Sequence, residues 1–345
     1  MRSDDGREID QSIATLSGEA AQQVARNGAE TVRETTPWEH IPGAGGEDVT
    51  YYGRPLLKES VWSIDIPLYY FLGGAAGAAM TLGAAAQFAC GESRELRRFS
   101  EVCHWTGIIG STLGAAFLIH DLGRPERFLG MVRVFRPTSP MNIGAWILAT
   151  AAPSSIATGL LIHREGWLGK LGDAAGYVSG VFGAGLAGYT GVLVSNSAIP
   201  AWIPGRRWMP MLFLASGASS AASILDLFHK GREAARITLL FGTAARAVEI
   251  AAGRRVEEAA AEVPKVAEPF RRGATGLLWK AAGGLTAASL VLALVPGESR
   301  RRRRVAGVLG ILGSLSMRFA VHYISNASAR DARASFRQQR TAAQI

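Results

Sequence analysis

Acidic, basic and imidazole side chains are concentrated in one short stretch that directly follows a long apolar run. The stretch LIHDLGRPERFLGM, which begins at Leu118, contains His120, Asp121 and Arg124. Carboxylate and imidazole groups can carry protons, and a guanidinium can hold a carboxylate or a ligand oxygen in place. Because a helix C-terminus repels negative charge, Asp121 needs a cation, and Arg124 follows three residues later. The pattern predicts a proton-handling carboxylate held by an arginine, although an Asp121–Arg124 pair that only caps a loop explains it as well.

Tyrosines and a second acid occupy the ends of two other apolar runs. Asp65 precedes the run IPLYYFLGG, where the positive end of a helix dipole favours a carboxylate. Tyr69 and Tyr70 follow within this run, and Tyr189 lies near the end of a later one. Phenol hydroxyls can donate hydrogen bonds to a carbonyl oxygen. These residues complement the acids if the fold brings the runs together.

The elements that carry these residues are expected to be membrane-spanning helices. Of the 345 residues, 48% are hydrophobic and only 19% are charged, whereas soluble domains carry about a quarter charged residues. The charges are clumped, and the stretches of about twenty apolar residues between them match a hydrocarbon core about 30 Å thick. The sequence therefore predicts an all-α polytopic membrane protein. The expected spans are about 64–88, 103–121, 142–163, 174–197, 208–228, 234–252, 274–295 and 305–325.

The sixth expected span is the weakest, because Arg246 and Glu249 interrupt it. If this segment only lies at the interface, the protein has seven spans. We expect eight, because residues 229–273 would otherwise form an unusually long connection. The many small residues inside the spans indicate close helix packing.

The number of crossings decides which helix ends share a membrane face. We call the face that holds the N-terminus side A. With eight spans, the start of the first span and the ends of the second and fourth lie on side A. Asp65, Asp121 and Tyr189 should therefore converge there. The numbers of basic residues on the two faces are too similar for the positive-inside rule to orient the protein.

A site at the membrane edge with aromatic walls, phenols, carboxylates and a histidine suits a quinone. The quinone head group is flat and apolar, and each of its two carbonyls takes a proton on reduction. Entry from the lipid explains why the site should lie at the edge of the bilayer. Haem is not expected, because a b-type haem needs axial ligands that face each other inside the slab, and the six histidines do not meet there.

Charged residues also lie within the later spans. A charge inside the bilayer costs roughly 2.5–3.5 kcal/mol on insertion scales, so it usually faces the bundle interior or marks function. Arg246 and Glu249 are three residues apart and can pair on one helix face. Internal pairing and snorkelling explain such charges, and a proton path is the alternative. The candidate proton path consists of Asp226, Arg246, Glu249, Lys280 and Arg318.

Several other classes of function are disfavoured. The net charge is +9, but the arginines flank apolar spans and can anchor them at lipid headgroups, so no nucleic acid partner is expected. Cys90 and Cys103 cannot hold an iron–sulfur cluster of their own, which needs four ligands, and they fit no zinc pattern. The polar first sixty residues predict no signal peptide. We expect this extension to be partly disordered or to dock a partner.

Three stretches resemble one protein family. DLGRPERFLGMVRVFRPTSPMNIGAW (Asp121 to Trp146) resembles the signature region of the NrfD/PsrC family, the membrane subunits of nitrite, polysulfide and related reductases. VWSIDIPLYYFLGGAAGAA (from Val61) and GYTGVLVSNSAIPAW (from Gly188) are also similar to it. The resemblance covers about residues 51–325. Its first half is highly specific, and its second half matches mainly in the pattern of spans.

The resemblance implies a fold and an assembly. Eight transmembrane helices would form two four-helix bundles, 61–200 and 201–326, between the N-terminal extension 1–60 and a basic tail, 327–345. Such a protein docks a four-cluster ferredoxin-like iron–sulfur subunit beside a catalytic reductase or dehydrogenase subunit. It exchanges electrons with menaquinone or ubiquinone and carries no haem. The implied location is the bacterial cytoplasmic (inner) membrane, with the quinone site on the periplasmic side.

The resemblance also implies which residues bind the quinone. We expect Asp121 to handle a proton, with His120 as a secondary proton carrier. Alone, the chain has no redox centre and should catalyse nothing. Two alternatives stay open, namely an ion- or proton-coupled transporter and a purely structural anchor that docks a soluble enzyme through DLGRPERF. The implied quinone-binding residues are Asp65, Tyr69, Asp121, Arg124 and Tyr189.

Overall fold

The protein is described by a computed structural model. The described residues are 9–10, 15–16, 55, 57–58, 60, 62–228, 231–297 and 299–342. The chain divides into two compact units, Met1–Arg54 and Pro55–Ile345. In the first unit, β1 (Ile9–Asp10) and β2 (Thr15–Leu16) pair antiparallel. The prediction of a disordered or docking N-terminal extension otherwise lies outside the described residues.

The second unit is helical throughout its regular elements. Within its described residues, no segment forms a strand. The helices are α2 (Asp65–Ala89), α3 (Arg94–Asp121), α4 (Pro125–Arg133), α5 (Pro140–Leu161), α6 (Gly166–Ser195), α7 (Met209–Phe228), α8 (Arg232–Ala261), α9 (Pro264–Arg271), α10 (Gly273–Leu294), α11 (Arg300–Arg330) and α12 (Ala332–Ala342).

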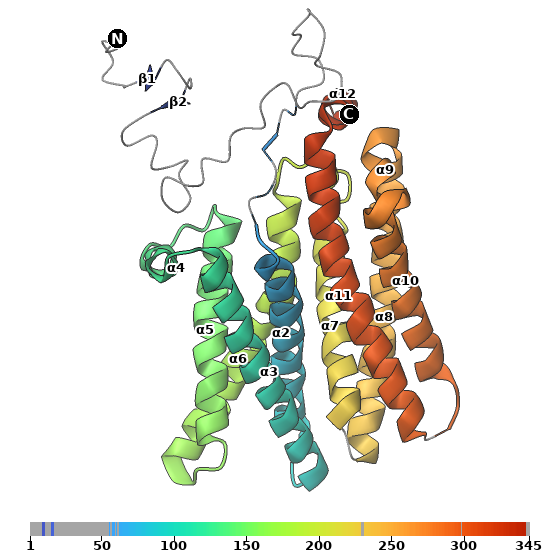
Figure 1. Cartoon of the computed structure of the whole chain (residues 1–345). Coiled ribbons are helices and arrows are strands. Elements are labelled where there is room, and N and C mark those ends of the chain that lie inside the picture. Colours follow the sequence, from blue (N-terminus) through green and yellow to red (C-terminus); the bar gives the residue numbers. More distant parts are fainter. Residues whose placement is uncertain are drawn as a thin grey trace, which may run out of the picture. The chain divides into compact units, whose positions relative to one another are not determined.

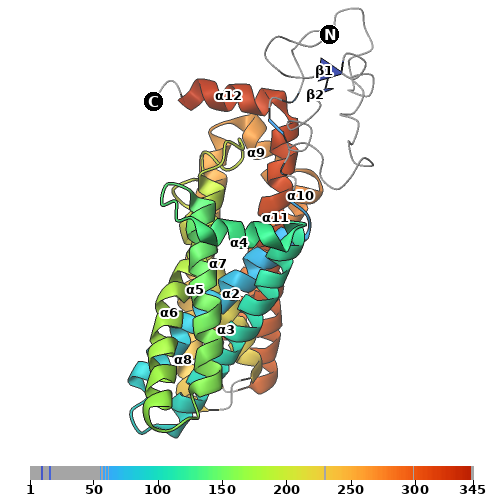
Figure 2. The same cartoon turned by 90° about the vertical axis from the view of Figure 1, so that its left-hand side faces the viewer.

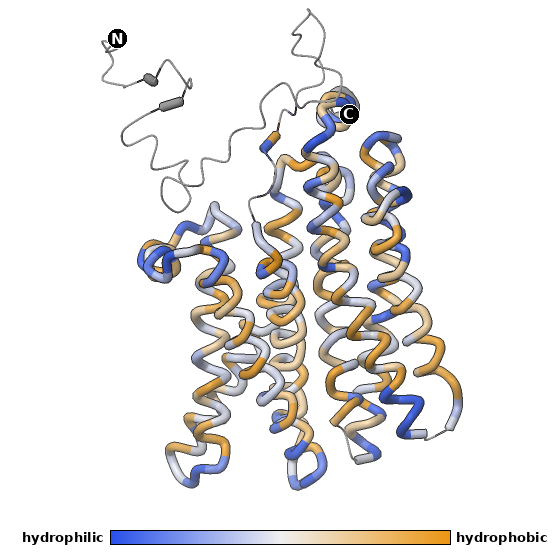
Figure 3. Tube along the Cα trace, viewed as in Figure 1, coloured by the Kyte–Doolittle hydropathy of each residue, from blue (hydrophilic) through white to orange (hydrophobic). Residues whose placement is uncertain are grey.

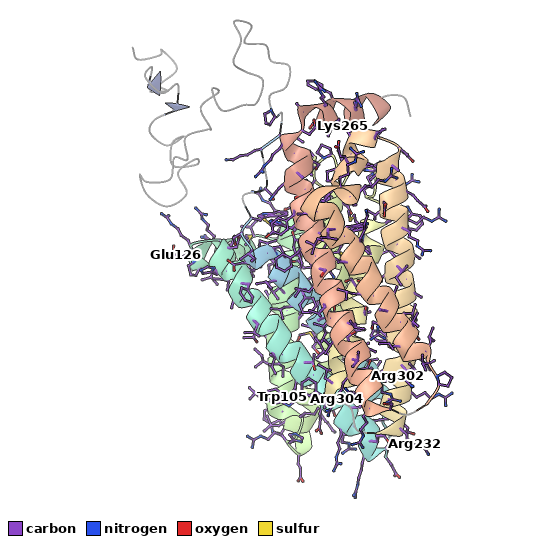
Figure 4. The ribbon with its side chains drawn as sticks, turned by 45° about the vertical axis from the view of Figure 1, so that its right-hand side comes forward. Trp105, Glu126, Arg232, Lys265, Arg302 and Arg304 are labelled. Carbon is purple, nitrogen blue, oxygen red and sulfur yellow. The ribbon has the colours of Figure 1, made fainter. Side chains whose placement is uncertain are left out.

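Seven of these helices are long and apolar enough to cross a membrane: α2, α3, α5, α6, α7, α10 and α11. Hydrophobic residues predominate in the middle of the helices, and hydrophilic residues gather near both ends (Figure 3). Charged side chains mark these ends, with Arg232, Arg302 and Arg304 near one end and Lys265 near the other (Figure 4). The prediction of an all-α polytopic membrane protein is confirmed.

The expected count of eight spans is not confirmed, because α8 is not among the seven apolar helices. This helix is long enough, at 30 residues, but it carries Arg246 and Glu249 in its middle. It nevertheless packs against α7 and α10 in the second half of the chain (Figure 1). Neighbouring helices can shield buried charges from lipid, so a crossing by α8 stays a prediction.

We describe the eight long helices as two groups of four, of which α7 contacts helices of both groups. The first group contains α2, α3, α5 and α6, and the second contains α7, α8, α10 and α11 (Figure 1). Small residues permit close contact within and between the groups. A Cβ atom on Gly183 of α6 would lie only 2.6 Å from the carbonyl oxygen of Gly77 on α2. A Cβ atom on Gly217 of α7 would lie 2.8 Å from the carbonyl oxygen of Gly74, also on α2. These contacts agree with the packing role expected for the small residues.

A further helix, α4, follows the second span and lies outside the eight expected spans. Gly123, with a φ of 70°, ends the preceding turn of chain, and Pro125 occupies the first turn of α4, where its missing N–H costs nothing. The helix lies across the side-A ends of α3 and α5 (Figure 2). The basic tail also differs from a simple extension, since α11 continues to Arg330 and α12 packs against α9.

Candidate functional site

Two carboxylates meet at side A through a serine that precedes α2. The Ser63 hydroxyl lies 2.7 Å from Oδ1 of Asp121 and 2.9 Å from Oδ2 of Asp65. The backbone N–H of Ser63 also donates to Oδ1 of Asp121 over 2.9 Å. On the other side of Asp65, Nδ1 of His120 lies 2.7 Å from Oδ2. We call these four residues the carboxylate cluster.

The carboxylate cluster is suited to holding a proton. The Ser63 hydroxyl has one proton and can donate it to only one of the two carboxylates at a time. Two ionised carboxylates around a single donor repel each other, so a further proton within the cluster relieves the repulsion. The Asp65 side chain is 12% exposed, whereas that of His120 is 81% exposed. His120 therefore connects a buried carboxylate to the outside at side A.

Two tyrosines from different helices contact each other below this cluster. The hydroxyls of Tyr69 on α2 and Tyr189 on α6 form a short hydrogen bond, and we call them the tyrosine pair. Tyr69 lies four residues after Asp65 and therefore on the same face of α2. Gly144 on α5 makes room for the Tyr189 ring, because a Cβ atom there would lie 2.5 Å from Cδ2 and 2.7 Å from Cζ.

Aromatic rings extend from the tyrosine pair toward the second group of helices. Trp62 stacks on Trp202 with ring centroids 6.0 Å apart, and its edge meets Tyr70 at 6.2 Å. Tyr70 also packs edge-on against Phe213 of α7. The Tyr70 hydroxyl is buried and has no hydrogen-bond partner among the described residues. The site thus combines proton-active groups with a flat apolar wall.

Arg124 follows Asp121 by three residues and lies where α4 begins. It is exposed and forms the N-cap of α4, and Asp121 hydrogen-bonds to Ser63. An ion pair between Arg124 and Asp121 stays a prediction. The chain around it is held by Asn142 of α5, whose side chain donates to the carbonyls of Met131 and Val134 over 2.6 and 2.9 Å. Asn142 is therefore the anchor of α4.

The candidate proton-path residues divide into a buried group and one exposed lysine. Arg246 contacts Asp226 on α7 at 3.6 Å rather than pairing along its own helix, and it donates to Ser223 over 2.9 Å. Arg318 donates to the backbone carbonyl of Phe213 over 2.8 Å. Asp226 is half-buried, and the fully buried members of this group are Arg246, Glu249 and Arg318. Lys280 is exposed and donates to the carbonyl of Arg271, so it is not joined to the others.

Sequence reasoning missed Ser63 and Asn142. Ser63 directly precedes Ile64, the N-cap residue of α2, and a serine so close to a helix start could have been singled out. Its contact with Asp121 depends on how α2 and α3 pack, which no local pattern reveals. Asn142 follows a proline at the start of α5, and its partners lie in the preceding eleven residues.

The arrangement defines a class of protein. It is an integral membrane protein of packed helices, with proton-active and phenolic side chains converging at one membrane face. Among the described residues, no three His, Cys, Asp or Glu side chains are grouped so that they could hold a metal ion.

Comparison with known proteins gives the family. The family model described as polysulphide reductase, NrfD, matches residues 56–327. The chain therefore belongs to the NrfD family, as the resemblance of the three stretches predicted. Members of this family are membrane subunits of respiratory oxidoreductases that interact with quinones and assemble with iron–sulfur and catalytic subunits. No individual curated protein matches the chain.

Proposed function

We propose that the chain binds a membrane quinone at the side-A end of its first helix group and exchanges electrons with an iron–sulfur partner subunit docked there. The observation that carries the proposal is the position of the carboxylate cluster and the tyrosine pair, which occupy adjoining ends of α2, α3 and α6. A quinone supplies two-electron chemistry coupled to two protons. The protein must therefore hold a ring by its oxygens and exchange protons beside it.

The phenols of the tyrosine pair are the groups that hold the ring oxygens in this proposal. Each phenol can donate one hydrogen bond, and their present contact with each other can be exchanged for contacts with a ligand carbonyl. The stacked Trp62 and Trp202 supply an apolar surface of the kind that a flat ring requires. Arg124, the exposed N-cap residue of α4, is the group proposed to hold a ring oxygen or Asp121.

In this proposal, the carboxylate cluster carries the protons to and from the quinone. Asp121 takes or gives a proton through Ser63, and Asp65 passes it to His120, whose exposed ring reaches the outside. The route is short because each neighbouring pair is within hydrogen-bond distance. The proposed setting is the bacterial cytoplasmic membrane with side A toward the periplasm. The partners would be a four-cluster ferredoxin-like subunit and a catalytic subunit, with menaquinone or ubiquinone as the substrate.

The buried charges of the second group support a subordinate proposal, a proton path. Asp226 and Arg246 are in contact, and Arg318 lies on α11 between Phe213 and the first group. Glu249 is buried nearby with Ser314. Lys280 is exposed and makes a separate contact, so it would serve only as an outer end of such a path.

The experiment uses the complex purified with its co-purifying subunits. Asp121→Asn and Tyr189→Phe should each abolish quinone-linked turnover while the complex still assembles. Tyr177→Phe is a matched control, because Tyr177 lies on the same helix, about 18 Å along the axis from Tyr189, and should retain activity. Full activity of both site variants would refute quinone binding at this site. Loss of assembly in both would favour the structural anchor.

A further inference from the structure

A cavity of about 300 Å³ lies between α8 and α10 in the second helix group. It involves neither the carboxylate cluster nor the tyrosine pair, and we call it the α8–α10 cavity. Most of its surface is apolar, and charged side chains contribute the rest. The apolar and glycine residues that line it include Leu212, Ile250, Gly253, Gly283, Gly284 and Met317.

Two cations that line this cavity have no carboxylate partner among the described residues. Arg254 and Lys280 are both exposed. Arg254 forms no ion pair or hydrogen bond with the described part of the chain, and Lys280 donates to the backbone carbonyl of Arg271 over 3.0 Å. Glu257 also lines the cavity, but it accepts from the indole N–H of Trp279 over 3.2 Å and faces Arg271 at 3.9 Å. The charges of Arg254 and Lys280 therefore call for an anion from outside the chain.

Arg254 and Lys280 lie at the same depth, because α8 and α10 are antiparallel neighbours. Arg254 lies seven residues before the last residue of α8, and Lys280 lies seven residues after the first residue of α10. At 1.5 Å per residue, each is about 10 Å from the side-A end of its helix. Long basic side chains near the end of a helix reach the level of the lipid headgroups. The two cations are therefore placed to meet a headgroup.

The rest of the cavity continues from these cations toward the middle of the bilayer. Gly283 and Gly284 follow Lys280 by about one turn of α10, which is a candidate membrane span. Both glycines are exposed, and a Cβ atom on either would meet nothing within 4 Å. Ile250 of α8 lines the same part of the cavity. An exposed hollow at this depth contacts hydrocarbon rather than water, so the part of a ligand that fills it must be apolar.

The one acidic residue deep in the lining does not oppose an anion at the side-A end. Glu249 is buried, and its carboxylate lies beside the hydroxyls of Ser216, Ser219 and Ser314. It precedes Arg254 by more than one turn of α8. The lining thus asks for a negative group at the headgroup level and for an apolar chain below it. An apolar helix of another protein could cover the glycines, but it would leave the two cations without a counter-charge.

We propose that the α8–α10 cavity binds an anionic glycerophospholipid of the bilayer. The phosphodiester lies between Arg254 and Lys280, and one acyl chain descends past Ile250, Gly283 and Gly284. A guanidinium can pair with two phosphate oxygens at once, and an ammonium adds a point charge. Basic pockets between transmembrane helices bind anionic headgroups through the same chemistry. The inference does not depend on quinone binding in the first helix group.

The test measures phospholipid binding to the complex, purified in detergent with its co-purifying subunits. The probe is phosphatidylglycerol with a photoreactive diazirine in one acyl chain, and labelled residues are mapped by mass spectrometry. We expect saturable label on α8 and α10. Unlabelled phosphatidylglycerol should displace the probe. Diacylglycerol with the same acyl chains should not, because it lacks the phosphate.

Two pairs of variants locate the headgroup and the acyl chain. Arg254→Gln should weaken the saturable label about tenfold, because a charge-assisted hydrogen bond is lost. Arg255→Gln is its matched control, since Arg255 is exposed beside it but pairs with Glu258 over 3.2 Å and does not line the cavity. Gly284→Leu should abolish the label by filling the hollow. Ala288→Leu should keep it, because Ala288 is exposed one turn farther along α10 and outside the lining.

The phospholipid site is overturned if diacylglycerol displaces the probe as well as phosphatidylglycerol does, or if Arg254→Gln binds as tightly as Arg255→Gln. Label on α8 and α10 that does not saturate, or that persists in Gly284→Leu, also overturns it. A cross-link from this face of α10 to a co-purifying subunit would assign the cavity to a protein helix instead. None of these results changes the expected effect of Asp121→Asn or Tyr189→Phe on quinone-linked turnover, so the two proposals fail separately.

Discussion

The position of the Tyr189 ring depends on the absence of a side chain at Gly144, and this dependence can be tested directly. In Gly144→Ala, the new Cβ atom would lie 2.5 Å from Cδ2 of Tyr189, whereas non-bonded carbon atoms rest at about 3.5–4.0 Å. Because Cε2 of the ring would lie nearer still, the ring must retreat by more than about 1 Å or α5 must move away. Because a misplacement of about 1 Å at a reacting group can cost about 100-fold in rate, we expect quinone-linked turnover to fall by about that factor.

The assay is quinol oxidation or quinone reduction by the purified complex, measured together with its thermal unfolding. Overpacking costs about 1–3 kcal/mol, so the variant should remain folded. Gly188→Ala is the matched control on the neighbouring helix, since its Cβ atom would meet Leu214 at an ordinary 3.7 Å. It should keep full activity.

A double-mutant cycle separates displacement of Tyr189 from other effects of the alanine. In a Tyr189→Ala background the ring is gone, so Gly144→Ala should cause no further loss of thermal stability. The reasoning is refuted if Gly144→Ala alone leaves turnover unchanged. It is equally refuted if the two substitutions lower thermal stability additively.

Three further predictions concern stability and the side-A surface. Asn142→Ala should release α4 and speed tryptic cleavage after Arg133 in the folded protein, because three side-chain hydrogen bonds are lost. Unchanged cleavage would contradict its anchoring role. Asp226→Leu should destabilise the protein by about 3–5 kcal/mol by leaving the Arg246 guanidinium buried without its acid, and adding Arg246→Met should restore most of the stability in thermal unfolding. Lys265 holds the pKa of Glu268 below its usual value through a hydrogen bond and its charge. The contact therefore stabilises the protein at neutral pH and is lost as the pH falls through the folded-state pKa, so Glu268→Gln should lose less thermal stability on acidification than the unaltered chain.

The sequence predicted the helical class and the convergence of three helix ends, because both follow from long apolar runs and from counting crossings. Asp65, Asp121 and Tyr189 do lie at the side-A ends of α2, α3 and α6. The sequence could not predict the individual side-chain contacts between the helices, since these contacts depend on the rotation of each helix about its axis. Asp121 meets Ser63, which no charge pattern indicated.

In the second helix group, the periodicity of the sequence could not predict the ion-pair partners, for a different reason. Arg246 and Glu249 are spaced to pair on one helix face, yet Arg246 contacts Asp226 of the neighbouring helix. Within a packed membrane bundle, a partner on another helix removes both charges from lipid, which an intrahelical pair on an exposed face does not. Spacing along one helix could not distinguish these outcomes. The short helix α4 was missed because Gly123 and Pro125 indicate a turn as readily as a helix start.

The glycine contact between α2 and α7 has a mechanical consequence. Gly74 and Gly217 bring two backbones together at the boundary between the helix groups, and Arg318 donates across this region to the carbonyl of Phe213. A hinge needs loosely packed residues or a layer that can slide. At this boundary, which we call the seam, two backbones are in contact and the buried Arg318 guanidinium is hydrogen-bonded to one of them. Rocking of one half against the other, on which alternating-access transport relies, would have to break these contacts. We therefore expect the two halves to move as one rigid body, so that any communication between them is electrostatic and leaves the seam closed.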